Sequence, residues 1–404
     1  MLAASIPLSR LRLLITLAVS QIFGWGLSFD LMGVFGRLMA HDLGMANELA
    51  FGGITVMMLI MGFSGPWSGR LIARHGASRI LTCGSVTLGA GLVLLSQSTG
   101  PISFLGSWAV LGLGGTLGLS VPTYAAVVER EGADSKRLIG ILMIFTGLSA
   151  AVCWPLAHAM EGWIGWRHSL LAGAALHLFV LAPLHRFGLP RANPAQSENN
   201  ATSATAPLVL TASQEKRALL ALTVISIGFS GLTFGLAPSL ITLMQQSGAD
   251  LSLAVQLASF RSVLGISARA MDVVAGKKAS PLLSGFTGAG FMLLSLPILY
   301  FAQGSFLLMA LFIGAYGIGS GLSAVSRTVL PLSFFSASRF AGISASLALP
   351  SNIANALSPV LITALLDYGG LPLVLSFALA VNLLVLAALF TLATLSRTST
   401  ALSN

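Results

Sequence analysis

The chain has 404 residues, of which 55% are hydrophobic and only 8% are charged. Soluble domains usually carry about a quarter charged residues, so this composition excludes an ordinary soluble enzyme or binding module. Apolar runs of about 20 residues or more recur along nearly the whole chain, and each is long enough to cross a bilayer. The 44 glycines also fit an all-α polytopic membrane protein, because glycine lets membrane helices pack closely.

In chain order, the apolar runs predict twelve transmembrane helices. The expected spans are 13–37, 49–70, 80–98, 103–128, 138–160, 167–187, 218–244, 252–271, 281–301, 305–327, 340–366 and 371–396. After the sixth run, residues 188–216 are rich in Pro, Ser, Thr, Asn and Ala, which predicts a flexible cytoplasmic linker. We therefore expect a six-helix bundle at 1–187, the linker at 188–216 and a second six-helix bundle at 217–404.

The distribution of the basic residues tests this count, because cytoplasmic loops carry an excess of Lys and Arg. With the N-terminus in the cytoplasm, 17 of the 21 basic residues fall on the cytoplasmic side. They are Arg10, Arg12, Arg70, Arg74, Arg79, Arg130, Lys136, Arg137, Arg186, Arg191, Lys216, Arg217, Arg269, Lys277, Lys278, Arg339 and Arg397. Only Arg37 and Arg167 fall on the opposite side. The net charge of +9 is thus a topology signal, and no nucleic-acid partner is needed to explain it.

No pattern in the chain predicts catalysis, a cofactor or a metal. The two cysteines, Cys83 and Cys153, lie in apolar surroundings without metal-ligand spacing, and we expect no disulfide. The glycine cluster at 112–115 lies inside a predicted membrane helix, so it is not a dinucleotide fingerprint. We find no catalytic triad and no phosphate loop, and we expect that the protein is not an enzyme.

Arg261 lies near the middle of the span 252–271. At helical spacing it shares a face with the small residues Ala254, Ala258, Gly265 and Ala268. An arginine inside an apolar helix is costly and by default marks a ligand or ion pathway. Its planar fork of donors suits a carboxylate or another oxyanion. The alternative is a structural arginine that bonds helix carbonyls or an acidic partner.

Asp30 lies in the outer half of the span 13–37. A carboxylate in a low-dielectric environment binds a proton more readily, so Asp30 is a candidate for substrate contact and for proton coupling. The alternative places it near the outer surface, hydrated or paired with Arg37. Pairing with Arg261 in the empty protein is a further hypothesis.

Arg327 ends a stripe of Tyr316, Ser320 and Ser323 at helical spacing. It is a candidate second anion contact or a cytoplasmic gate. It is equally well explained as an ordinary basic residue at the membrane edge.

Uncharged polar residues also lie at positions suited to the lining of a cavity. The candidates for substrate contact are Asn352 and Asn355 in the span 340–366, Tyr124 in 103–128 and Ser230 in 218–244. For each of them, an interhelical hydrogen bond worth under about 1 kcal/mol is at least as good an explanation.

The loop after the second span reads G-R-L-I-A-R-H-G-A-S-R from residue 69 to residue 79. It resembles the loop signature of the major facilitator superfamily, G-x-x-x-D-R-x-G-x-R. Gly69, Arg74 and Gly76 match the signature in place, Ala73 takes its acidic position, and Arg79 supplies the final basic residue one position later. The resemblance implies two pseudo-symmetric six-helix bundles that rock about a central site, with these four residues in a gating loop.

Within that superfamily, the segment 261–268 resembles the R-x-x-x-G-[LI]-x-A pattern of monocarboxylate porters and oxalate:formate exchangers. The resemblance implies that Arg261 binds a substrate carboxylate. Leu257 stands where this branch often has an aspartate, and Asp30 stands where monocarboxylate porters carry a lysine.

These features together predict a secondary active transporter in the bacterial plasma (inner) membrane, with both termini in the cytoplasm. It would move a small organic anion, similar to a monocarboxylate, by alternating access, with proton coupling or by exchange. Its expected partners are a small-molecule substrate, protons and the lipid bilayer, and we expect a monomer. The alternative is an efflux pump that exports drugs or toxic compounds such as metalloids by proton antiport. A membrane sensor without transport is a third class, which the absence of a sizeable soluble domain disfavours.

Overall fold

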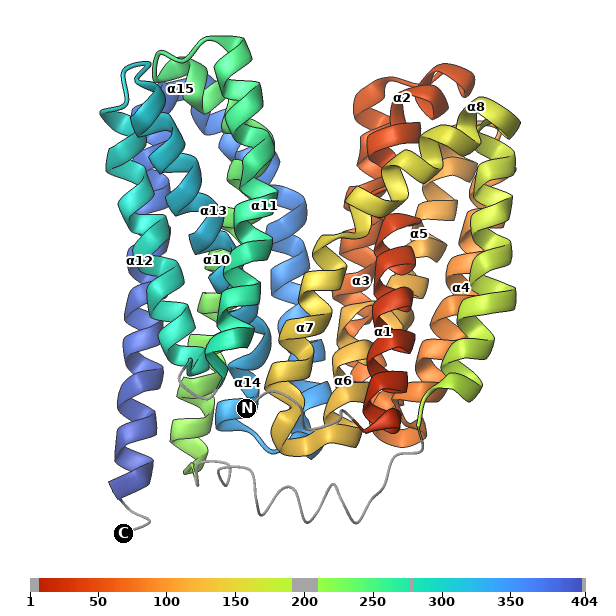
Figure 1. The fold of residues 1–404 in the computed structure, drawn as a ribbon, viewed down its shortest axis with the longest axis horizontal. Helices are drawn as coiled ribbons and strands as arrows, with labels where there is room; N and C mark the ends of the chain where they lie inside the picture. The colour runs from red at the N-terminus through yellow and green to blue at the C-terminus, as the bar shows by residue number, and fades with distance from the viewer. Residues whose placement is uncertain (1–6, 191–209, 277–278, 402–404) are drawn as a thin grey trace. The chain divides into compact units, whose positions relative to one another are not determined.

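The computed structural model describes residues 7–190, 210–276 and 279–401, nearly all of them in helices. The chain forms two compact units; in Figure 1 the helices before residue 190 are drawn from red to yellow-green and those after residue 210 from green to blue. The first comprises Met1–Ala206 and Ala337–Leu349, and the second comprises Pro207–Ser336 and Pro350–Asn404. Most of the predicted linker at 188–216 lies outside the described residues.

The first unit is built from helices that follow one another with short connections. They are α1 (Leu8–Gly26), α2 (Met32–Asp42), α3 (Asn47–His75), α4 (Ala77–Ser96), α5 (Pro101–Gly118), α6 (Ser120–Glu131), η1 (Gly132–Asp134), α7 (Ser135–Gly147), α8 (Ser149–Leu176), η2 (His177–Leu181) and η3 (Leu184–Gly188). The last two are π-helical turns that continue the direction of α8.

The second unit has fewer and longer helices. They are α10 (Ala212–Gln246), α11 (Leu251–Ala275), α12 (Pro281–Tyr300), α13 (Phe306–Val329), α14 (Pro331–Phe334) and α15 (Ala337–Ala401). The opening segment of α15, up to Leu349, groups with the first unit.

Eight helical stretches among the described residues are long and apolar enough to cross a membrane. Two of them, with 54 and 60 residues, have more than twice the length of about 20 residues that one crossing needs. Each of these two stretches turns back at a glycine with positive φ, at Gly165 (72°) and at Gly370 (64°) (Figure 1). With α1–α2 and α11, these crossings account for the twelve predicted helices and confirm an all-α polytopic membrane fold.

The first predicted span, 13–37, is not one continuous helix. It divides into α1 and α2, and Asp30 lies in the turn between them, so its predicted place within a helix was wrong. Gly24 and Gly26 weaken the helix at this point, and the Ser28 hydroxyl donates to the Gly24 carbonyl. A Cβ on Gly26 would lie 2.1 Å from Cys153 Sγ, so glycine there allows α8 to approach closely.

Close backbone approach also joins α4 to α5 in the first unit. A Cβ added to Gly84 would lie 2.4 Å from the backbone nitrogen of Gly118. Nearer the start of α5, Phe104, Trp108 and Leu111 are fully buried in the unit's core. Small residues and large apolar ones thus alternate along α5, and the small ones set the distance between the two helices.

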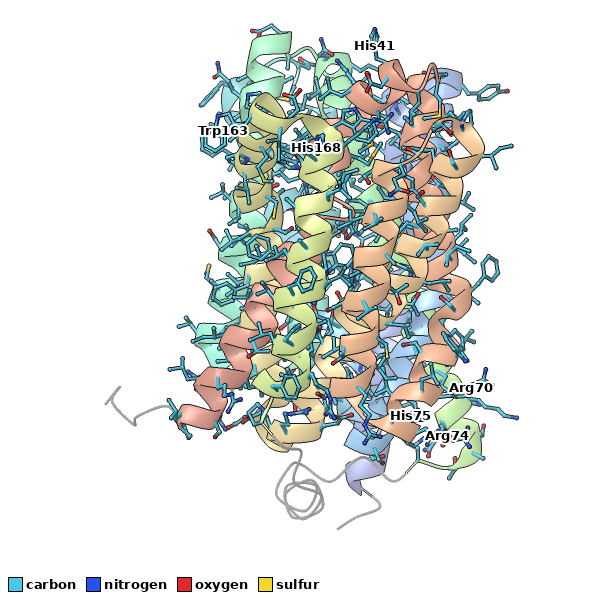
Figure 2. The ribbon with its side chains drawn as sticks, turned by 90° about the vertical axis from the view of Figure 1, so that its right-hand side faces the viewer. His41, Arg70, Arg74, His75, Trp163 and His168 are labelled. Carbon is cyan, nitrogen blue, oxygen red and sulfur yellow. The ribbon has the colours of Figure 1, made fainter. Side chains whose placement is uncertain are left out.

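The two ends of the first unit carry different residues. Figure 2 shows Arg70, Arg74 and His75 at one end of this unit and His41, Trp163 and His168 at the other. The loop at 70–79 and the connection after α2 are joined by a single membrane crossing, α3. They must therefore lie at opposite ends of the unit, as they do.

We expect that Gly84→Leu destabilises the protein by about 3 kcal/mol, because the side chain would force α4 away from the α5 backbone. Thermal unfolding of the purified protein in detergent measures this. The matched control is Gly106→Leu on α5, where an added Cβ meets no atom within 4 Å; we expect a change within about 0.5 kcal/mol. Equal destabilisation by both substitutions would contradict the close α4–α5 packing.

Candidate functional site

Arg261 is positioned by a close contact between α11 and α13. A Cβ on Gly317 would lie 3.1 Å from the Arg261 carbonyl oxygen, and one on Gly321 would lie 2.4 Å from the Gly265 carbonyl oxygen. Glycines on both helices therefore let the two backbones touch. This contact fixes the part of α11 from which the Arg261 side chain projects.

The Arg261 side chain is half-buried, and its charge interacts with the buried hydroxyl of Tyr316. Among the residues that the structure describes, Arg261 forms no hydrogen bond and no ion pair. The Tyr316 hydroxyl itself donates to the carbonyl oxygens of Leu232 and Thr233 on α10, each at 3.1 Å. Arg261 thus has donors available for an oxyanion, and its alternative role as an internally bonded arginine has no support in these contacts.

Arg327 and Ser230 are two predicted site residues that the structure brings together. Arg327 is half-buried near the end of α13, and its Nη1 donates to Ser230 Oγ on α10. Ten residues separate Arg327 from Gly317, which lies beside Arg261. At 1.5 Å per residue, the two arginines are separated by about 15 Å along the helix axis. They cannot hold one small anion together in this arrangement.

Asn352 and Asn355 lie one turn apart on α15, where Asn355 Nδ2 donates to Asn352 Oδ1 at 3.5 Å. On the same side of α15, Ser358 packs against α10: its Oγ would lie 3.2 Å from a Cβ on Gly231. The pair thus lies close to the helix that carries Ser230. Asn355 Oδ1 is buried and has no hydrogen-bond partner among the described residues.

The first unit holds Asp30 and Tyr124. Asp30 is half-buried, and its carboxylate accepts a hydrogen bond from Ser149 Oγ on α8. The indole of Trp154 donates to the Asp30 carbonyl oxygen at 2.8 Å. The structure describes no ion pair between Asp30 and Arg37. Tyr124 is buried on α6 with 7% of its surface exposed.

The loop between α3 and α4 is held at both of its ends. A Cβ on Gly69 would lie 2.8 Å from Ala345 Cβ, so α3 packs tightly against the opening segment of α15. Gly76 has φ +78°, a conformation that favours glycine, and it joins α3 to α4. Arg74 and Arg79 are exposed.

Two functional candidates were missed from the sequence because they come from distant segments. Glu129 on α6 accepts a hydrogen bond from the Ala77 backbone nitrogen at 2.9 Å. In this loop, Ala73 stands at the position where the superfamily signature has an aspartate. Glu129 therefore supplies a carboxylate to the loop from another helix. Ser149 is the other, as the hydrogen-bond partner of Asp30. Neither position carries a local sequence signal.

A sequence model of the Major Facilitator Superfamily matches residues 14–296, which is more than half of the chain. The chain belongs to the major facilitator superfamily. Members of this superfamily are transporters that bind small-molecule substrates and act as single chains. This protein is therefore a polytopic membrane transporter of the secondary type.

Solved structures of the superfamily share the fold. The human organic anion transporter MFSD10 (TETRAN) has a TM-score of 0.68 and 14% identity, covering 96% of this chain and 100% of that chain. FucP in the outward conformation has a TM-score of 0.66 and 12% identity, covering 94% and 98%. The proton:xylose symporter XylE, bound to 6-bromo-6-deoxy-D-glucose, has a TM-score of 0.67 and 12% identity, covering 94% of each chain. A search of the curated proteins finds no match.

The Arg327–Ser230 contact predicts energetic coupling between the two residues. In a double-mutant cycle of Arg327→Gln and Ser230→Ala, we expect a coupling free energy of about 0.5–1.5 kcal/mol, the range for hydrogen bonds between membrane helices. Unfolding of the purified protein in mixed micelles measures it. In the control cycle, Arg327→Gln is combined with Thr363→Ala on α15. The Thr363 hydroxyl donates to the Pro359 carbonyl oxygen of its own helix, so the two substitutions should have additive effects. Additivity for the Ser230 pair would contradict the contact.

Proposed function

We propose that this transporter moves a small organic anion similar to a monocarboxylate, with Arg261 as the group that binds its carboxylate. The observation that carries the proposal is the half-buried Arg261, which has no hydrogen-bond partner among the described residues and projects from a helix packed tightly on α13. The similarity to a human organic anion transporter supports the same substrate class.

The neighbouring polar groups have distinct roles in this proposal. The Tyr316 hydroxyl is held by α10 carbonyls beside Arg261 and limits the space for the anion. Asn352 and Asn355 of α15, Ser230 of α10 and Tyr124 of α6 contribute uncharged donors along the substrate's path. Arg327, bonded to Ser230, attracts the anion nearer the cytoplasmic end of its helix.

Anion import is opposed by the membrane potential, at about 2.3 kcal/mol per charge per 100 mV. A proton that moves with the anion cancels this cost, and so does exchange for another anion. Asp30 is the proposed proton carrier, because its carboxylate is half-buried and accepts from a neutral hydroxyl rather than from a cation. The proton-coupled XylE shares the fold.

The loop of Gly69, Arg74, Gly76 and Arg79 is the proposed gating element. Tight packing of Gly69 against the opening segment of α15 gives the loop a contact that the transport cycle has to break and re-form. We also propose a bacterial inner membrane as the location. The distribution of the basic residues supports the proposed orientation, with both termini in the cytoplasm.

A second candidate function is proton-driven efflux of drugs or other toxic compounds. The Asp30–Ser149 contact favours it equally, because an antiporter also needs a buried carboxylate that exchanges protons. For metalloids, a pair of thiols would be expected. Cys83 is exposed and Cys153 is buried, an arrangement that does not favour a shared thiol site.

We expect that Arg261→Ala abolishes uptake of organic acids by reconstituted vesicles, because the anion loses its only proposed cationic ligand at that level of the bundle. A panel of radiolabelled mono- and dicarboxylates identifies the substrate first. Arg261→Lys should retain charge but lose the bidentate geometry and show at least about a tenfold lower rate. Arg37→Ala, which removes an exposed arginine, is the matched control and should transport normally. Near-normal uptake by Arg261→Ala would refute the anion site.

Asp30→Asn separates proton coupling from exchange. The amide cannot carry a proton, so a pH gradient should no longer drive accumulation, whereas exchange of labelled for unlabelled substrate should persist. Vesicles with and without an imposed pH gradient measure the two rates. Asp367→Asn on α15 is the control, since this carboxylate is exposed. Accumulation at the wild-type level in Asp30→Asn would exclude Asp30 as the proton carrier.

A further inference from the structure

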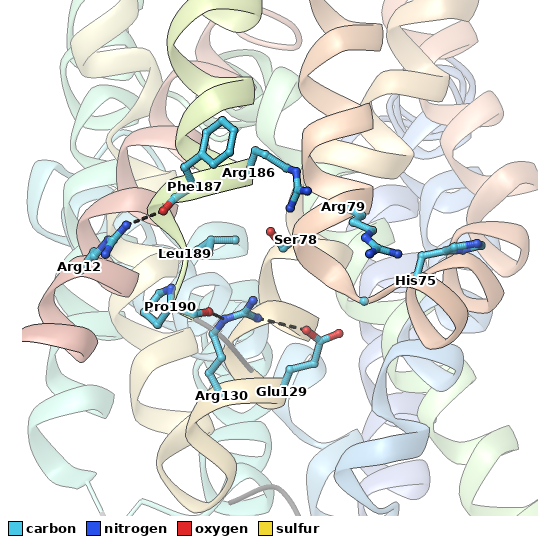
Figure 3. Close-up of a pocket in the computed structure, with 11 residues that line it drawn as sticks. Arg12, His75, Ser78, Arg79, Glu129, Arg130, Arg186, Phe187, Leu189 and Pro190 are labelled. Carbon is cyan, nitrogen blue, oxygen red and sulfur yellow. Dashed lines mark hydrogen bonds and ion pairs between the residues drawn. The ribbon is translucent and has the colours of Figure 1, made fainter. Parts of the chain in front are cut away.

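The first unit contains a basic cavity that the transport proposal does not use. Its volume is about 770 Å³, and it lies at the end of the unit where His75 is found (Figures 2 and 3). Segments far apart in the sequence supply its charged lining. The charged and titratable residues are Arg12, His75, Arg79, Glu129, Arg130 and Arg186.

Two of the four arginines are held in place by the protein. Arg12 donates to the Phe187 carbonyl oxygen. Arg130 donates to the Pro190 carbonyl oxygen at 2.7 Å and pairs with Glu129 at 3.1 Å. Carbonyl oxygens orient a guanidinium group without neutralising it, so Glu129 is the one carboxylate that balances four positive charges in this cavity.

The other two arginines, Arg79 and Arg186, are available to a ligand. Both side chains are exposed, and neither forms a hydrogen bond or an ion pair in the described part of the chain. Both side chains line the cavity together with Ser78 (Figure 3). Arg186 lies 5.7 Å from the centre of the Phe187 ring, a contact that leaves its donors open.

The start of α4 adds to the positive potential. The cavity is lined by Gly76 and Ser78, at the N-terminus of this 20-residue helix. Unpaired backbone N–H groups and the helix dipole favour an anion at such a position. Glu129 already occupies the Ala77 nitrogen, so the arginines remain the principal source of attraction.

We propose that this cavity binds a phosphate group. Four guanidinium groups against one carboxylate repel each other unless an anion joins them, and the planar fork of arginine matches phosphate oxygens. Basic pockets at the cytoplasmic ends of membrane helices are suited to phospholipid headgroups.

The surroundings of the cavity favour the phosphate of an anionic membrane lipid over a free phosphate compound. α1 and η3 both supply lining residues and contact each other. Large apolar side chains are exposed on these and the neighbouring element: Ile15 on α1 is 54% exposed, the lining residue Phe187 on η3 is 72% exposed, and Phe179 on η2 is 77% exposed. Acyl chains of a lipid whose headgroup fills the cavity would lie along this apolar surface.

The test measures binding to the purified full-length protein. Native mass spectrometry and thermal shift are recorded with a short-chain phosphatidylglycerol, a short-chain phosphatidylcholine, glycerol 3-phosphate and inorganic phosphate. The key variant is Arg79→Gln/Arg186→Gln. The matched control is Arg70→Gln/Arg74→Gln, which removes two exposed arginines from the same end of the unit but none from the cavity lining.

We expect the wild type and the control to bind phosphatidylglycerol in preference to phosphatidylcholine. The key variant should bind it about 30-fold more weakly, because each arginine near an anionic group contributes about a fivefold factor. Arg79→Lys/Arg186→Lys should restore part of the affinity and shows that the loss is not a folding defect. Binding of glycerol 3-phosphate or inorganic phosphate with the same variant pattern, but not of the lipid, would support the phosphate site and overturn its lipid source. Equal binding by the key variant and the control, or no binding of any phosphate compound, would overturn the proposal.

Discussion

Close approach of helix backbones is the constraint on which this structure depends. Helices in a bilayer gain little from bringing apolar side chains together, because lipid tails are equally apolar. They associate instead where small residues let backbones touch, as at Gly84 on α4 and at Gly265 and Gly321 between α11 and α13. The same contacts set the direction of neighbouring side chains. The position of Arg261 therefore depends on glycines, which have no functional side chain.

Several polar side chains inside the units are hydrogen-bonded across helices. His185 is bonded to Ser20 at 2.7 Å and to Ser85 at 2.9 Å, and Asp30 and Arg327 each contact a serine. Such pairs remove the cost of an unbonded polar group in hydrocarbon. Arg261 differs, because it has no hydrogen-bond partner among the described residues, and this is the property that a substrate site requires.

Positive charge serves two ends in this chain. Spread over the loops, it supports the proposed orientation of the helices, with both termini in the cytoplasm. Folding also brings four of the basic residues together from separate segments. Arg12, Arg79, Arg130 and Arg186 line one cavity. A transporter that binds a phospholipid there would couple the α3–α4 loop to the composition of the membrane, since Arg79 belongs to both.

The sequence alone determined what depends on length and composition. Hydropathy and the distribution of basic residues gave the twelve crossings, and the cost of a charge in an apolar helix singled out Arg261. Tertiary structure decided what depends on contacts between distant segments. The turn that holds Asp30, its bond to Ser149 across 119 residues and the bond between Arg327 and Ser230 across 97 residues have no local signal. Glu129, which bonds the loop at Ala77, was hidden for the same reason. Hydrophobicity is a property of each segment, whereas a hydrogen-bond partner is known only when helices have packed.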